Sequence, residues 1–229
     1  MISVTLGKMV SLCYNISIMK NYIVFDLEWN QSANGKERSV PHFPFEIIEI
    51  GAVKLNENFQ MTGEFHRLVR PQVYTQMHHA ISEGTHMNMK ELRSSGELFP
   101  DAAAEFLAWC GGDAVFCTWG NMDLLELQRN MDYYHMENPF PKPLLYYDVQ
   151  KLYGLFCREN ARISLDSAVE EQNLMEDRPF HRALDDAYYT GKLLTMLGKT
   201  PGPDAILPFK SVDYYRLPSD KKEEIRMTF

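Results

Sequence analysis

The chain has 229 residues, a length that fits one medium-sized domain with extensions or at most two small domains. Hydrophobic residues make up 45% of it, and no apolar run is long enough to span a membrane, so we expect no membrane partner. The formal net charge of −8 excludes a protein that coats nucleic acid through a general positive field. Local contact with a phosphodiester stays open, because bound divalent cations reverse the local charge.

The first 18 residues lack a basic start, an unbroken apolar stretch and a small-residue cleavage site, so we do not expect a secretion signal. Met19 shortly precedes the first strong apolar run. We therefore interpret residues 1–18 as an N-terminal extension or as the product of an upstream translation start.

The four cysteines form no CxxC pair and have no metal-like spacing with histidine. They are Cys13, Cys110, Cys117 and Cys157. This usage is typical of reduced thiols, and it predicts a cytoplasmic (intracellular) protein.

Strands dominate the first part of the chain. Residues 21–27 predict a buried strand, and the segment 31–44, which contains Gly, Ser, Asn and Pro, predicts a loop. Residues 45–55 and 60–70 predict two more strands, and the turn residues between them predict a hairpin.

Helices then alternate with strands. The expected helices cover residues 79–82, 87–92, 99–111, 121–134, 149–158, 164–172 and 183–197. The expected strands between them cover residues 113–120 and 143–149. Asp101 marks the start of the third helix, Ser164 is a candidate cap of the sixth, and Gly198 is expected to end the last. This order predicts an α/β fold, a mixed sheet flanked by helices with one antiparallel hairpin.

The tail over residues 200–229 carries Pro201, Pro203 and Pro208. We expect it to serve as a linker or to pack partly on the domain through aromatic side chains. These are Phe209, Tyr214 and Tyr215.

Two acids, Asp26 and Glu28, follow three apolar residues of the first strand. Residues two apart in a strand point to the same face, so both carboxylates are expected to aim at one spot. Like charges that close repel each other unless a cation neutralises them, which favours a metal site. The alternative is a strand end that meets solvent, where acidic side chains cost little.

Asp123 lies just past the strand at 113–120 and opens the next helix, which also carries Met122, Leu125 and Met131 at roughly helical spacing. It is either a further oxygen ligand or an acid favoured by the helix dipole.

His181 lies just before the last expected helix, and Asp185 and Asp186 lie in its opening turns. Small and apolar residues share one face of it and predict close packing on the sheet; they are Ala183, Ala187, Thr190 and Leu194. Asp186 neighbours this face, whereas Asp185 is displaced by about 100° around the helix. Asp186 is therefore better placed to reach the sheet.

DxE on a strand, Asp after a later strand and HxAxxD on a late helix occur here in that order. The pattern resembles the DEDDh 3′–5′ exonuclease superfamily, of the ribonuclease T and DNA polymerase III proofreading-subunit type. The matching residues are Asp26, Glu28, Asp123, His181 and Asp186. The resemblance runs from about Tyr22 to Leu197.

Three further segments support this resemblance. "EIIEIGAVKL" is similar to the second strand of the family, "TWGNMD" to its second motif, and "HAISEGTHM" to the segment that leans over the 3′ end of the substrate. Within the superfamily they look most like the histone-mRNA 3′-exonuclease subgroup. The chain departs from the pattern at Trp29 and Gly84, near the expected base pocket, which leaves the substrate preference open.

The resemblance implies a ribonuclease H-like exonuclease domain over residues 19–199. It implies a metal-dependent 3′–5′ exonuclease that hydrolyses phosphodiester bonds from the 3′ end of single-stranded nucleic acid, with RNA favoured over DNA. The product is a nucleoside monophosphate.

The resemblance also implies two ions, Mg²⁺ or Mn²⁺, in the active site. Asp26 would bridge them, Glu28 and Asp186 would hold the ion that activates water, and Asp123 would act on the second ion. His181 would be the general base. At the terminal nucleotide we expect the backbone of Leu27 and the ring of Trp29, although core packing beside the sheet is the alternative for Trp29.

Two other functions stay open. One is a proofreading-type DNA exonuclease partnered with a polymerase. The other is a non-catalytic nucleic-acid-binding adaptor that kept the fold, and the intact set of acids argues against it.

Deletion of residues 1–18 tests the interpretation of the N-terminus. Because the functional domain is expected to begin at Met19, nuclease activity and the thermal unfolding midpoint should stay nearly unchanged. Activity assays and thermal unfolding of both forms measure this, and a large loss of either property would contradict it.

Overall fold

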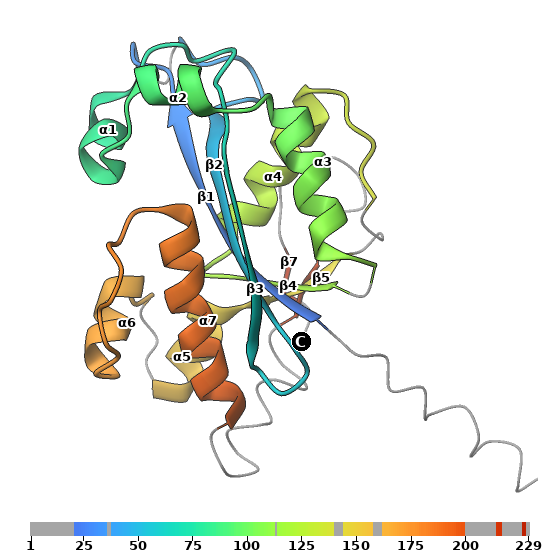
Figure 1. The fold of residues 1–229 in the computed structure, drawn as a ribbon, viewed down its shortest axis with the longest axis vertical. Coiled ribbons are helices and arrows are strands. Elements are labelled where there is room, and N and C mark those ends of the chain that lie inside the picture. Colours follow the sequence, from blue (N-terminus) through green and yellow to red (C-terminus); the bar gives the residue numbers. More distant parts are fainter. Residues whose placement is uncertain are drawn as a thin grey trace, which may run out of the picture.

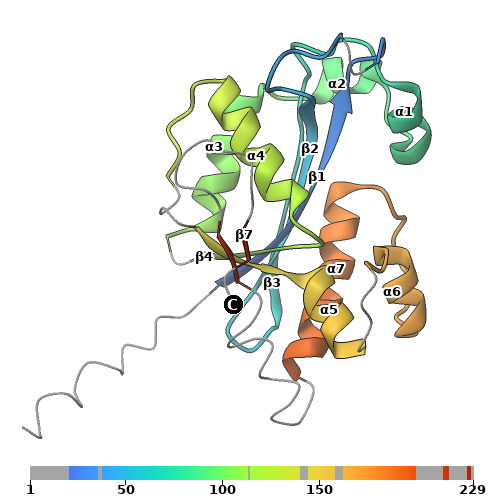
Figure 2. The ribbon, with the colours of Figure 1, turned by 180° about the vertical axis from the view of Figure 1, so that it is seen from behind.

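The computed structural model describes residues 21–35, 38–112, 114–139, 144–157, 162–199, 214–216 and 226–227. Within these ranges one mixed sheet has the strand order β3-β2-β1-β4-β5-β6-β7. Helices cover both faces of the sheet, as Figures 1 and 2 show from opposite sides. The predicted α/β class, a mixed sheet flanked by helices, is confirmed.

From β1 to α7, the strands and helices occur in the predicted order. The strands are β1 (Asn21–Gln31), β2 (Phe45–Leu55), β3 (Met61–Leu68), β4 (Ala114–Thr118), β5 (Leu145–Asp148), β6 (Tyr214–Arg216) and β7 (Arg226–Met227). The helices are α1 (His79–Thr85), α2 (Met89–Ser95), α3 (Phe99–Cys110), α4 (Met122–Tyr133), α5 (Val149–Cys157), α6 (Leu165–Glu171) and α7 (Ala183–Lys199). None of the helices in the described ranges is long and apolar enough to cross a membrane.

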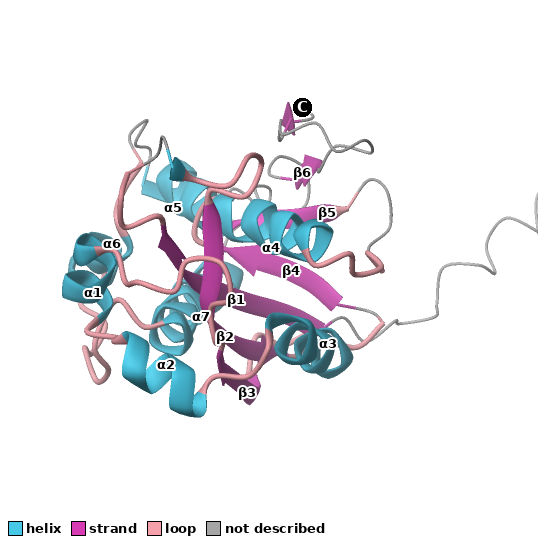
Figure 3. Cartoon of the chain, turned by 90° about the horizontal axis from the view of Figure 1, so that it is seen from above, coloured by secondary structure: helices cyan, strands magenta, loops and turns pink. Residues whose placement is uncertain are grey.

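Strand β1 lies in the middle of the sheet. It pairs antiparallel with β2, which forms the predicted hairpin with β3, and parallel with β4. Side chains of β1 alternate between two cores: Phe25 and Leu27 pack with α3 and α4, whereas Val24 packs with α5, α6 and α7. The view from above in Figure 3 places α4 and α7 on opposite sides of β1.

The prediction that the first strand ends at residue 27 is wrong. β1 continues to Gln31 because β2 pairs with it as far as Phe45. Asp26 and Glu28 therefore lie inside a strand of the sheet and not at its end.

Two details of the helices also differ from the predictions. Met122 is exposed, and the buried apolar side chains of α4 are Leu124, Leu127 and Met131. Gly198 does not end α7, which runs to Lys199. A Cβ atom on Gly198 would lie 2.6 Å from the ring of Phe59, so this glycine gives room to an aromatic ring.

In the tail, β6 extends the sheet beyond β5, with Tyr215 opposite Tyr146 and Tyr214 opposite Tyr147. Phe209, Cys13 and residues 1–18 lie outside the described residues. The other three cysteines are free thiols.

Helix α7 packs directly on β2 at Gly51. A Cβ atom on Gly51 would lie 2.0 Å from the backbone nitrogen of Leu184, in the first turn of α7. The predicted stripe of α7 faces the sheet, and its members are buried: Ala183, Ala187, Thr190 and Leu194. The absence of a side chain on Gly51 thus sets how closely the start of α7 approaches the sheet.

Gly51→Ala should lower the free energy of unfolding by about 3 kcal/mol or more, because the added methyl group must displace helix backbone. Gly84→Ala is the matched control: nothing lies within 4 Å of a Cβ atom there, and alanine favours the helix over glycine by about 1 kcal/mol. Urea unfolding of both variants measures the difference. Equal stability of the two would contradict the direct contact of α7 with β2.

Candidate active site

Three carboxylates from two elements meet on one face of β1. One oxygen each of Asp26, Glu28 and Asp186 lies within 4.8 Å of the others. Asp26 and Glu28 reach this point because alternate residues of β1 face α7, and Asp186 reaches it from the first turns of α7. Asp185 points elsewhere and lies 3.6 Å from the guanidinium of Arg178, so Asp186 is the better placed of the two acids.

Asp123 stands at the edge of this group. It is 4% exposed, and its Oδ1 accepts a hydrogen bond of 3.1 Å from the backbone N–H of Leu27. The opening of α4 after β4 brings it there, where β1 no longer pairs with β4. The N–H of Leu27 thus has a partner within the protein, and it holds the carboxylate beside β1.

His181 is exposed and lies just before α7. Its backbone N–H donates to Oδ1 of Asp186 over 3.2 Å, and its φ of 64° is in the left-handed region. Non-glycine residues adopt this conformation rarely, often at functional sites. The structure therefore attaches the histidine to the acid group through its backbone and leaves its imidazole accessible.

Burial and mutual repulsion raise the pKa of every acid in the group. Burial is the largest cause for each, and it raises the pKa of Glu28 to about 8, of Asp123 to about 7 and of Asp186 to about 6. The pKa of Asp26 is raised well above its ordinary value by burial and then by the charges of Asp123, Glu28, Asp186 and Glu49. Asp26 thus feels the repulsion of all four neighbouring acids.

The sequence analysis missed Glu49, the fifth acid of the region. It stands opposite Glu28 on β2, and only 1% of it is exposed. Its carboxylate accepts hydrogen bonds from His66, from the guanidinium of Arg182 at 2.6 Å and from the backbone N–H of Ala183 at 3.1 Å. Burial opposes its charge, but these hydrogen bonds lower its pKa below the ordinary value. The signal in the sequence was an acid within the apolar run "EIIEIGAV".

Trp29 lies on the other face of β1. Its ring packs 5.6 Å from the ring of Phe45 and against the core shared with α3 and α4, partly buried. Leu27 faces the same core. The expected contact of these two residues with substrate stays a prediction.

The acid group fits a divalent cation. Carboxylate oxygens are the ligands that Mg²⁺ and Mn²⁺ prefer. Among the described residues, no basic side chain forms an ion pair with Asp26, Glu28 or Asp186, whereas Glu49 is paired with Arg182. Three close, half-buried carboxylates without a cationic partner are costly to ionise, and a bound cation removes that cost.

Comparisons with known proteins agree with this geometry. The sequence model of the RNase T exonuclease family matches residues 23–194. The chain belongs to this exonuclease family. The predicted resemblance to DEDDh 3′–5′ exonucleases and the prediction of a hydrolytic enzyme are thereby confirmed.

The names and titles of individual relatives describe exonucleases. The probable 3′-5′ exonuclease KapD of Bacillus subtilis is 26% identical over 185 residues, which cover 76% of this chain and 83% of that protein. Among solved structures, a full-length 3′-exonuclease matches with a TM-score of 0.71 at 19% identity, over 91% of this chain and 90% of its own. The nuclease domain of 3′hExo, a DEDDh family member bound to rAMP, matches with a TM-score of 0.66 at 23% identity. This match covers 79% of this chain and 93% of that domain.

The raised pKa values predict an unusual pH dependence of stability. A carboxyl group whose pKa is raised by folding loses its stabilising contribution as the pH rises through that folded pKa. In EDTA, the unfolding temperature should therefore fall from about pH 4, where carboxyl groups of the unfolded chain ionise, to about pH 8, with the contribution of Asp186 lost by about pH 6, that of Asp123 by about pH 7 and that of Glu28 by about pH 8. The fall should be about 2–4 °C for each kcal/mol lost.

Mg²⁺ or Mn²⁺ should restore the unfolding temperature most at pH 8, because the ions bind the ionised carboxylates. Thermal unfolding with and without metal measures this, and Glu28→Gln should reduce both the fall and the restoration. An unfolding temperature in EDTA that rises across this range would contradict the assignment.

Proposed function

We propose that this protein removes nucleotides one at a time from the 3′ end of single-stranded RNA, with two divalent cations, Mg²⁺ or Mn²⁺, in the site. The observation that carries the proposal is the convergence of Asp26, Glu28 and Asp186 without a basic partner among the described residues, beside an accessible histidine. The family and its fold neighbours supply the reaction class.

The carboxylates would hold the ions between β1 and α7. Asp26, Glu28 and Asp186, whose carboxylates lie within 4.8 Å of one another, would be ligands of the ions. Asp123, whose carboxylate the N–H of Leu27 holds beside β1, would be a further ligand. When bound, the ions supply the positive charge that activates water and stabilises the leaving oxyanion.

His181 would be the general base. Its imidazole is accessible, and histidine is the side chain that most often accepts a proton from water as a general base. The bond from its backbone N–H to Asp186 keeps the residue next to the acids while its side chain stays free to approach substrate.

RNA is the proposed substrate because of the relatives. One fold neighbour, at 19% identity, is described as a 3′-exonuclease that recognises the 3′ end of a histone mRNA stem-loop, and another, 3′hExo, was solved with rAMP. A third, at 16% identity, is described as a complex of exonuclease I with single-stranded DNA, so DNA is the alternative to test. A nucleoside monophosphate is the proposed product.

A 5′-labelled single strand tests this function. With Mg²⁺ or Mn²⁺ the protein should produce a ladder that shortens from the 3′ end, faster on RNA than on DNA, and EDTA should abolish it. Asp26→Asn should abolish digestion, and His181→Ala should lower kcat by about 10²–10⁴-fold. Asp101→Asn and His135→Asn, which change an acid of α3 and an exposed histidine that follows α4, should change nothing.

Two outcomes would reject the proposal. The first is a lack of digestion of both RNA and DNA with either metal, which together with retained binding in His181→Ala would favour an adaptor. The second is a clear preference for a DNA 3′ end with a mismatch, which would favour a proofreading enzyme.

A further inference from the structure

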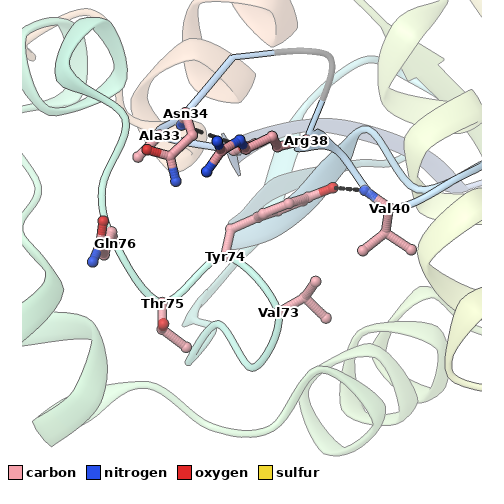
Figure 4. Close-up of a pocket in the computed structure, with 9 residues that line it drawn as sticks. Ala33, Asn34, Arg38, Val40, Val73, Tyr74, Thr75 and Gln76 are labelled. Atoms are coloured by element: carbon pink, nitrogen blue, oxygen red, sulfur yellow. Dashed lines mark hydrogen bonds between the residues drawn. The ribbon is translucent and has the colours of Figure 1, made fainter.

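A recess of about 340 Å³ lies beyond the end of β1, outside the acid group. The loop that follows β1 forms one wall, with Asn34 and Arg38, and the segment before α1 forms the other, with Thr75 and Gln76. Figure 4 shows the ring of Tyr74 between these two walls. Neither the family resemblance nor the proposed chemistry uses these residues.

The recess is preformed, because hydrogen bonds hold both walls. The hydroxyl of Tyr74 accepts from the N–H of Val40 at 3.0 Å and donates to the carbonyl of Phe43, which ties the first wall to the second. Behind Tyr74, the carboxylate of Glu46 is 1% exposed and accepts from the backbone N–H groups of Gln72, Val73 and Tyr74. A buried carboxylate with so many donors makes this part of the backbone rigid.

Asn30 connects the recess to the strand that carries the acids. It is fully buried, it donates to the carbonyls of Tyr74 and Gln76, and it accepts from the N–H of His78. The pairing of β1 with β2 shifts by one residue after Glu28, and the extra residue of this bulge belongs to β2. The alternation of side chains along β1 is therefore unbroken, and Asn30 faces the same side of the sheet as Glu28. The recess thus continues the face on which the acids lie.

The chemistry of the walls suits a nucleic acid. Arg38 is exposed, and within the described ranges its guanidinium forms no ion pair or hydrogen bond. Other arginines of the chain differ, since Arg67, Arg178 and Arg182 are all paired with acids. A guanidinium is a strong phosphate ligand, and the amides of Asn34 and Gln76 offer donors and acceptors to a base.

The distance along β1 between the acids and the recess indicates which nucleotide of a substrate the recess would hold. Ser32 lines the recess and is four residues beyond Glu28, about 13 Å along a β-strand. A stacked nucleic-acid strand rises about 3.4 Å per nucleotide. A substrate that runs along β1 with its 3′ end at the acids would therefore reach the recess within about four nucleotides.

We propose that this recess is a second binding site for the substrate strand, which holds a phosphate on Arg38 and a base between Asn34 and Gln76, about four nucleotides upstream of the 3′ end. The inference rests on the proposed exonuclease function. The site gives affinity for strands that are long enough to reach it and takes no part in cleavage.

Arg38→Gln tests the site, with Arg67→Gln as the matched control that removes one positive charge from β3. Kinetics on a dinucleotide and an octanucleotide with Mg²⁺ are compared, and fluorescence anisotropy reports octanucleotide binding in EDTA. Arg38→Gln should raise KM and Kd for the octanucleotide about tenfold, leave kcat unchanged and leave the dinucleotide unaffected. The slope of log Kd against log salt concentration should fall by about 0.7, the value for one phosphate contact of a single strand.

Asn34→Ala is a second variant, expected to weaken octanucleotide binding by a smaller factor. Unchanged KM and Kd for the octanucleotide in Arg38→Gln, or equal changes for both lengths, would overturn the second site while the exonuclease function stands. If the wild-type protein cleaves nothing but binds the octanucleotide through Arg38, the proposed function fails and the binding site is supported. If the wild-type protein neither cleaves nor binds the octanucleotide, both the exonuclease function and the second binding site are overturned.

Discussion

The seating of the first turn of α7 on β2 decides where the active-site groups of this protein lie. Gly51 lets the helix backbone touch the strand, and the carboxylate of Glu49 receives the Arg182 guanidinium and the Ala183 N–H at the helix start. Asp186 is one turn further along, and His181 is just before it. A shift of the helix start would therefore move a proposed metal ligand and the proposed base together, away from the acids on β1.

Glu49 and the acids proposed to bind metal show how environment separates similar groups. All of them lie in one region, where each negative charge disfavours the others. Glu49 has hydrogen bonds from two basic side chains and a backbone amide, so it stays ionised and serves the structure. Asp26, Glu28 and Asp186 have no basic partner within an ion-pair distance among the described residues, which destabilises the metal-free fold and favours cation binding.

Local patterns in the sequence predicted most elements but misplaced some of their ends and faces. Alternation and turn residues located the hairpin of β2 and β3, and helical spacing located α7 and its buried stripe. The end of β1 was misplaced because pairing with β2, not local polarity, extends the strand through Gln31. Gly198 was expected to stop a helix, but tertiary packing of Phe59 explains the glycine instead.

By itself the sequence determined the α/β class, the order of the acids and the exonuclease family, because periodicity and motif spacing are local properties of the chain. Only the tertiary structure decided which acids meet. It brought one carboxylate oxygen each of Asp26, Glu28 and Asp186 within 4.8 Å of the others, revealed Glu49 as a structural acid and turned Trp29 toward the core. It also brought Arg38 opposite Gln76 across the recess beyond β1. These outcomes depend on contacts between residues far apart in the chain, which no local pattern encodes.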